Sequence, residues 1–135
     1  EIGYKSFSGC SGLREISIPS TVKTVGIGAF ENCTELKDIS LPTTLTEINY
    51  YTFSGCTSLT TLTLHSKLTA INNYAFAGCK SLTEIHCKNS NPPLIGENTF
   101  RDVNRIGCKI FVPSKRAKKS YSTALYWNEF TIYIE

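Results

Sequence analysis

A 23-residue repeat limits the possible folds of this chain more than any other feature of its sequence. One phenylalanine recurs in every repeat, and a cysteine follows it three residues later. The positions are Phe7, Phe30, Phe53 and Phe76 for the ring and Cys10, Cys33, Cys56 and Cys79 for the thiol. A fixed period of roughly 20 to 50 residues is typical of proteins that stack one structural unit on another. We therefore expect an array in which each unit contacts only its neighbours.

Each repeat contains a short stretch in which aliphatic and polar residues alternate. In the first complete repeat, Ile16 and Ile18 alternate with Glu15 and Ser17. Because neighbouring strand residues point to opposite faces, this pattern predicts a β-strand with one buried and one exposed face. Stacked repeats would pair these strands in a parallel sheet, about 4.8 Å apart. The sequence thus predicts an α/β-type repeat solenoid, mostly β, with one parallel strand per 23-residue repeat.

The rest of each repeat must close the coil. A second aliphatic pair, such as Leu45 and Ile48, is expected to form the opposite wall, and the stretch Ala29–Cys33 to form one helical turn. Cysteine stands where a small apolar residue would fit beneath the phenylalanine, and free cysteine behaves as such a residue. Side chains stacked in register run parallel instead of pointing at each other, which disfavours a disulfide. We therefore expect the four repeat cysteines to be free, buried thiols.

Both ends of the chain depart from the repeat. Residues 1–10 fit the latter half of a unit, with Ile2 in the Val25 slot, so we expect the natural chain to extend upstream. Near the other end, Asn91-Pro92-Pro93 interrupts the fifth unit. The Ile-x-Val-Pro sequence of residues 110–113 then reproduces the strand pattern once more.

The last residues have the character of a cap. We assign residues 1–113 to about five repeats, the first partial and the fifth degenerate, and residues 114–135 to a C-terminal cap of the same structural unit. A terminal unit that departs from the repeat and covers the last apolar layer is common in solenoids. Within the cap we expect a last strand over residues 130–134 and a short helix over residues 114–128. The helix would carry three apolar side chains inward: Tyr121, Leu125 and Trp127.

The combination of L-x-x-I-x-I/L-P with A-F-x-x-C at this period resembles the BspA-like class of leucine-rich repeats, over residues 2 to about 113. The ending, with Tyr121, Trp127 and Phe130, is similar to the tail that closes such arrays in surface proteins of gut and oral Bacteroidetes. The resemblance implies a right-handed leucine-rich-repeat superhelix at the cell surface or secreted. It implies no family-wide catalytic residue and no cofactor, because members share a scaffold that mediates adhesion and protein binding.

The residues needed for catalysis or for a metal site are sparse and badly placed. A hydrolytic triad needs a histidine, and the chain has only His65 and His86. His86 lies next to Cys87, but adjacent strand residues point to opposite faces. Zinc requires ligands that converge tetrahedrally, whereas the repeat cysteines follow one another in a line. We therefore predict that the chain is not an enzyme and holds no metal.

Charge and hydropathy argue against nucleic acid and membrane as partners. The net charge is +3, and four of the 14 basic residues lie in one short segment: Lys115, Arg116, Lys118 and Lys119. A nucleic-acid-binding face would spread such residues and place aromatic residues between them. No apolar run approaches the roughly 18 residues that a membrane span needs. The basic segment could instead meet an anionic glycan or an envelope surface, or form a solvated helix face.

Two surfaces are candidates for binding a partner. The first consists of the outward strand positions on the concave face of the sheet: Glu15, Ser17, Asp38, Ser40, Thr61, Thr63, Glu84 and His86. The alternative is a tyrosine group at the turn before the phenylalanine: Tyr4, Tyr50, Tyr51 and Tyr74. Exposed aromatic residues favour protein or glycan contacts. We expect an adhesion or protein-interaction module with a protein or glycan partner; the alternative is a structural spacer within a larger exported protein.

Overall fold

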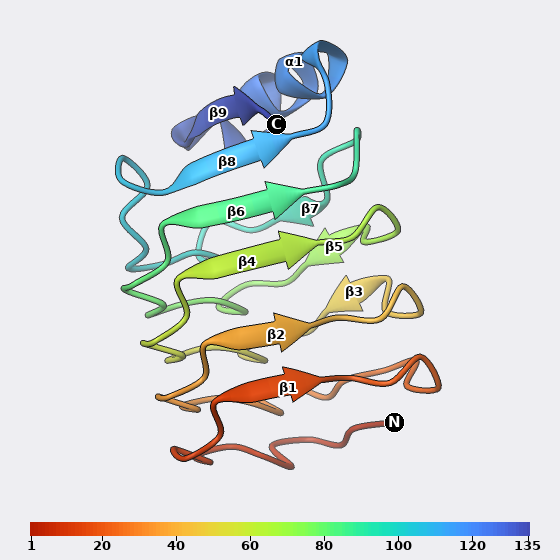
Figure 1. Ribbon diagram of the computed structural model, residues 1–135, viewed down its shortest axis with the longest axis vertical. Coiled ribbons are helices and arrows are strands. Elements are labelled where there is room, and N and C mark those ends of the chain that lie inside the picture. The colour runs from red at the N-terminus through yellow and green to blue at the C-terminus, as the bar shows by residue number, and fades with distance from the viewer.

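Successive repeats form the turns of one coil, stacked along the long axis of the molecule (Figure 1). The structure is a computed structural model that describes residues 1–135. One strand of each turn lies on the same face, and we call this wall the strand face. Its strands are β1 (Glu15–Ser17), β2 (Asp38–Ser40), β4 (Thr61–Leu64), β6 (Glu84–Cys87), β8 (Lys109–Val112) and β9 (Thr131–Ile134). Paired strands run parallel, with Ile16 opposite Ile39 and Leu62 opposite Ile85. The predicted mostly-β repeat solenoid is confirmed.

A second, narrower wall closes the coil behind the strand face. It consists of β3 (Glu47–Ile48), β5 (Ala70–Ile71) and β7 (Leu94–Ile95), which pair in parallel in that order. Lower in the coil, Ile2 and Val25 form an isolated parallel bridge. This bridge confirms that Ile2 occupies the slot of Val25 in the preceding turn.

The third wall contains the repeat phenylalanines and is made of tight turns. The prediction of a helical turn over Ala29–Cys33 is wrong. The backbone N–H of Phe30 donates to the oxygen of Thr52 in the next turn, at 2.9 Å, instead of donating within its own segment. Asn32 has a φ of 57°, which also interrupts a right-handed helix. This wall is therefore held by hydrogen bonds between turns.

The core is a set of parallel rows, one residue per turn. The phenylalanine rings stack along the coil, with 5.5 Å between the ring centroids of Phe30 and Phe53 and 5.4 Å between those of Phe53 and Phe76. Phe100 continues the row at 5.6 Å from Phe76. Each ring is buried by its neighbours above and below, so a single repeat could not bury its own apolar face.

The repeat cysteines lie beside these rings, and three of them are buried. Cys33, Cys56 and Cys79 have no exposed surface, as predicted, but Cys10 is exposed and the prediction that it is buried is wrong. All six cysteines of the chain are free in the structure. The thiols also have a polar role: Cys79 Sγ donates to the oxygen of Phe53, one turn lower, at 3.3 Å.

The C-terminal segment covers the top of the coil. Helix α1 (Lys115–Thr123) begins after Ser114, whose hydroxyl accepts a hydrogen bond from the N–H of Ala117 at 3.1 Å. A short 3-10 helix over Trp127–Glu129 and strand β9 follow, and β9 pairs in parallel with β8. Tyr121 and Trp127 are buried as predicted, but Leu125 is 69% exposed and that prediction is wrong. The helix ends at Thr123, so Leu125 is not on its inward face.

Candidate interaction surface

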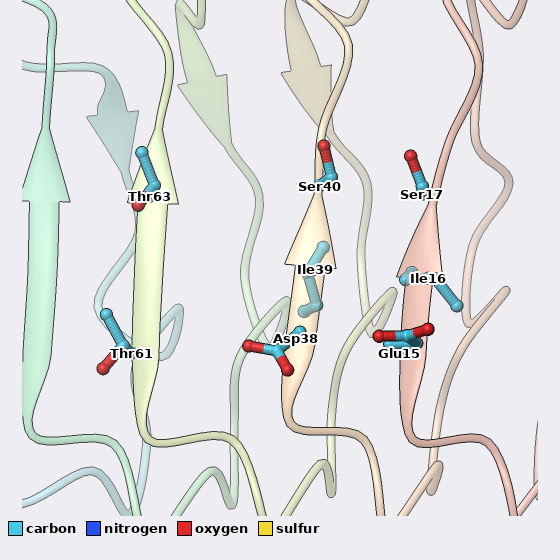
Figure 2. Close-up of a pocket in the computed structure, with 8 residues that line it drawn as sticks. All are labelled: Glu15, Ile16, Ser17, Asp38, Ile39, Ser40, Thr61 and Thr63. Atoms are coloured by element: carbon cyan, nitrogen blue, oxygen red, sulfur yellow. The ribbon is translucent and has the colours of Figure 1, made fainter.

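The eight predicted polar residues lie together on the strand face. The parallel register places Glu15 beside Asp38 and Ser17 beside Ser40. In Figure 2, Glu15, Asp38 and Thr61 form one row across three strands, and Ser17, Ser40 and Thr63 form a second. The remaining pair continues the rows on β6, where Glu84 lies beside Thr61 and His86 beside Thr63.

The lower half of this face is hollowed. A depression of about 470 Å³ lies over β1, β2 and β4. Its lining residues are Glu15, Ile16, Ser17, Asp38, Ile39, Ser40, Thr61 and Thr63. We call this depression the strand-face groove. It contains six of the eight predicted polar residues, together with two isoleucines that the sequence assigned to the core.

The polar side chains of the groove make no hydrogen bonds within the protein. Elsewhere in the coil, hydroxyl groups bond to backbone oxygens of the turn below: Thr69 Oγ1 donates to Thr46 at 2.9 Å, and Ser58 Oγ to Thr34 at 2.6 Å. Neither groove carboxylate, Glu15 or Asp38, takes part in an ion pair. The groove therefore presents donors and acceptors that only solvent or a partner can satisfy.

The upper half of the strand face is filled by aromatic side chains that the sequence analysis did not select. The imidazole of His86 stacks on the ring of Phe111 with 4.8 Å between ring centroids, and Phe111 lies 5.6 Å from Tyr133. These residues belong to β6, β8 and β9, which are neighbouring strands. The alternation of Phe111 with Ile110 and Val112 could have identified it as an outward strand residue.

His86 is held between two carboxylates. Its Nε2 atom lies 2.9 Å from Glu84 Oε2, and its Nδ1 atom lies 2.8 Å from Glu135 Oε1. Lys88 Nζ also approaches Glu135, at 3.0 Å. Burial favours the neutral imidazole, but the hydrogen bonds to Glu84 and Glu135 outweigh it and raise the pKa of His86. Because both ring nitrogens face acceptors, the arrangement favours the imidazolium, which donates from both.

The predicted tyrosine group divides into two parts. Tyr51 and Tyr74 stack with 4.9 Å between ring centroids and an angle of 2° between the rings. Both residues have positive φ, of 59° and 64°. The residue in the same slot one turn below Tyr51 is Gly28, which also has positive φ. Tyr50 is exposed beside this pair, whereas Tyr4 lies two turns lower and is 69% exposed. Ile27 and Gly28 occupy the two corresponding slots in the turn between Tyr4 and Tyr50, so the four tyrosines do not form a continuous stripe.

The basic segment forms the outer face of α1. Lys115, Arg116, Lys118 and Lys119 are exposed, and none of them forms an ion pair. Ala117 and Tyr121 form the buried face of the same helix. No three His, Cys, Asp or Glu side chains are grouped so as to hold a metal ion. None of the helices is both long and apolar enough to span a membrane.

The comparison with protein families agrees with the repeat geometry. The family model described as the BspA type leucine rich repeat region matches residues 1–127, in six copies. The chain belongs to the BspA-type leucine-rich repeat family. The match continues past residue 113 and includes most of the segment that we assign to the cap. A search of curated proteins found no match.

Solved structures also resemble this BspA-type chain. One is a leucine rich cell surface protein from Faecalibacterium prausnitzii A2-165, with a TM-score of 0.76 and 28% identity, covering 96% of this chain and 32% of that one. Another is the pneumococcal vaccine antigen PcpA, with a TM-score of 0.65 and 23% identity, covering 99% of this chain and 39% of that one. The chain thus spans about a third of the length of these proteins, and the second likeness concerns the fold alone.

These comparisons place the chain among leucine-rich repeat proteins related to bacterial cell-surface proteins. The leucine-rich repeat solenoid is typically a non-catalytic scaffold. Function in such a scaffold depends on the side chains that individual repeats present, and the fold by itself does not specify a partner.

Proposed function

We propose that this chain is a protein-interaction or adhesion module that presents its strand face to a protein or glycan partner at the cell surface. One observation carries the proposal: the strand-face groove gathers six polar side chains that form no hydrogen bonds within the protein. A rigid surface with unsatisfied donors and acceptors loses little conformational entropy when a partner binds. The location rests on the cell-surface relative from Faecalibacterium prausnitzii.

The lower half of the strand face suits a partner better than the upper half does. In the upper half, Glu84, His86 and Glu135 already bond to one another, and the ring of Phe111 covers the neighbouring strand. A partner would have to break these contacts before it could bind there. In the groove, Asp38 and Thr61 have no competing partner within the chain.

A binding screen with two matched variants tests this proposal. The chain would be screened against immobilised extracellular-matrix proteins, glycans and bacterial envelope proteins. We expect Asp38→Lys with Thr61→Lys to abolish binding to the partner found, because these exposed positions can change charge without disturbing the core. Glu84 is left unchanged, since it holds His86.

The tyrosine group supplies the matched comparison. Tyr50→Ala with Tyr51→Ala removes two exposed rings on another face of the coil. We expect this variant to retain binding. Loss of binding in the tyrosine variant, with normal binding in the lysine variant, would assign the contact to the tyrosine group. A chain that binds nothing in the screen would favour the spacer role over an interaction module.

A further inference from the structure

Two consecutive turns of the coil lack strand pairing on two of the three walls. We call this unpaired boundary the seam. On the strand face, β1 pairs with β2 and β4 pairs with β6, but no ladder joins β2 to β4. On the second wall, Val25 and Ile48 form no bridge, although each pairs with its neighbour on the other side. Figure 2 shows a wider interval between the strands of Asp38 and Thr61 than between those of Asp38 and Glu15.

The third wall keeps the seam closed from behind. Across the same two turns, Gly28 N–H donates to Tyr50 at 3.0 Å and Asn32 N–H donates to Ser54 at 2.7 Å. The opening is therefore confined to the strand face and the second wall. A further depression of about 190 Å³, beside Val25 and Glu47, marks it on the second wall. The strand-face groove lies over the other side of the same seam.

The seam leaves polar peptide groups available within the groove. In a parallel sheet, the N–H and C=O groups of each strand bond to both neighbours. The groups of β2 and β4 that face each other have no strand partner. Exposed peptide groups of this kind bond to water until a ligand supplies donors or acceptors for them.

The groove also has an apolar floor that the upper repeats lack. Ile16 and Ile39 are only partly buried. Leu62 and Ile85 occupy the same slot in the next two turns and are 1% and 0% exposed. The carboxylates of Glu15 and Asp38 lie beside this floor on adjacent strands, and no cation of the chain pairs with them.

We propose that the strand-face groove binds a lysine or arginine side chain of an extended protein segment. The aliphatic stem of that side chain lies on Ile16 and Ile39, and its cationic head bonds to the carboxylates of Glu15 and Asp38. The open carbonyl groups at the seam accept its remaining N–H groups. Anionic glycans are repelled by the same carboxylates, and neutral glycans supply no cation. This inference rests on the proposed function and narrows its partner to a basic protein segment.

A short synthetic peptide of alternating threonine and lysine is the probe, with a threonine–glutamate peptide as its comparison. Binding would be measured by isothermal titration calorimetry at about 0.15 M salt, where long-range attraction is largely screened. The chain has a net charge of +3, so non-specific electrostatic forces repel the lysine peptide and attract the glutamate peptide. We expect the wild-type chain to bind the lysine peptide and not the glutamate peptide.

The isosteric variant Glu15→Gln with Asp38→Asn removes both charges and keeps the shape of the groove. We expect it to bind the lysine peptide at least about tenfold more weakly, since a hydrogen bond to a charged group contributes that much. The matched control is Glu97→Gln with Asp102→Asn, which removes two exposed, unpaired carboxylates elsewhere on the coil. We expect this control to bind like the wild type.

Three outcomes would overturn the inference: no binding of the lysine peptide, equal binding of the glutamate peptide, or an equal loss of affinity in the control variant. None of them would by itself refute the proposed function, because the lysine variant of Asp38 and Thr61 tests the strand face with whatever partner the screen finds. If that partner depends on the strand face while the lysine peptide fails to bind, only the basic-segment inference is wrong.

Discussion

The indole Nε1 of Trp127 donates a hydrogen bond to the backbone oxygen of Pro93, at a distance of 2.8 Å. The phenol of Tyr121 does the same to the oxygen of Asn89, at 3.0 Å. These bonds connect the cap to the proline-containing segment that interrupts the fifth repeat. The irregular segment thus presents backbone acceptors, which a regular turn would use within its own ladder, to the aromatic residues of the cap.

The first prediction concerns this contact. Trp127→Ala should lower the free energy of unfolding by about 3 to 5 kcal/mol, because it removes a buried ring and leaves the oxygen of Pro93 without its donor. Leu125→Ala is the control. Because Leu125 is exposed, we expect its free energy of unfolding to change by no more than about 0.5 kcal/mol. Urea denaturation of both variants checks the prediction, and equal effects would contradict the cap geometry.

The second prediction concerns the thiols. Only Cys10 is exposed, and burial raises the pKa of the Cys79 thiol to about 12, so its reactive thiolate is scarce at neutral pH. In the native protein we expect a thiol reagent to modify Cys10 rapidly and the other five cysteines slowly. Denaturation without reductant should then release all six thiols. Two or fewer reactive thiols in denaturant would mean that the ladder is oxidised.

The third prediction is a pH dependence that originates at His86. Its pKa is raised, so its contribution to stability is complete below its ordinary value of 6.5 and is lost as the pH rises through the higher folded value. The hydrogen bonds from Lys88 and His86 lower the pKa of Glu135, so the contribution of that carboxylate is lost as the pH falls below its ordinary value of 4.5. Between these two pH values both groups stabilise the folded chain.

Thermal unfolding of the wild type and of His86→Gln across this range checks that window. We expect the difference in melting temperature to be largest between pH 4.5 and 6.5 and to shrink above it. The variant cannot form an imidazolium, so it should show little dependence near neutrality. A difference that grows as the pH rises from 6.5 would contradict the assignment of His86 as a charged donor.

The sequence predicts this fold well because a repeat specifies its own register. Once Phe30 and Phe53 are aligned, every other slot follows, including the pairing of Ile2 with Val25 that the structure confirms. The sequence predictions fail where the register of the repeat does not determine the backbone conformation. Phe30 and Asn32 donate to the next turn, so residues 29–33 form tight turns instead of a helix. The helix of the cap ends before Leu125.

The candidate surface was only partly predictable. Alternation along the strands identified the eight outward polar residues, because it depends on strand geometry alone. It did not reveal the seam between β2 and β4, since the two strands have the same pattern as their paired neighbours. The contact of Glu135 with His86 was also missed, because it joins residues 49 apart that only the cap brings together.

An amide-resolved NMR footprint of the chain with the strongest binder from the screen would show directly which face of the coil meets the partner. We expect the largest shifts on the lower strand face, at residues 15–17, 38–40 and 61–63. A footprint that leaves these residues unchanged and concentrates on Tyr50, Tyr51 and Tyr74 would contradict the claim that the strand face meets the partner.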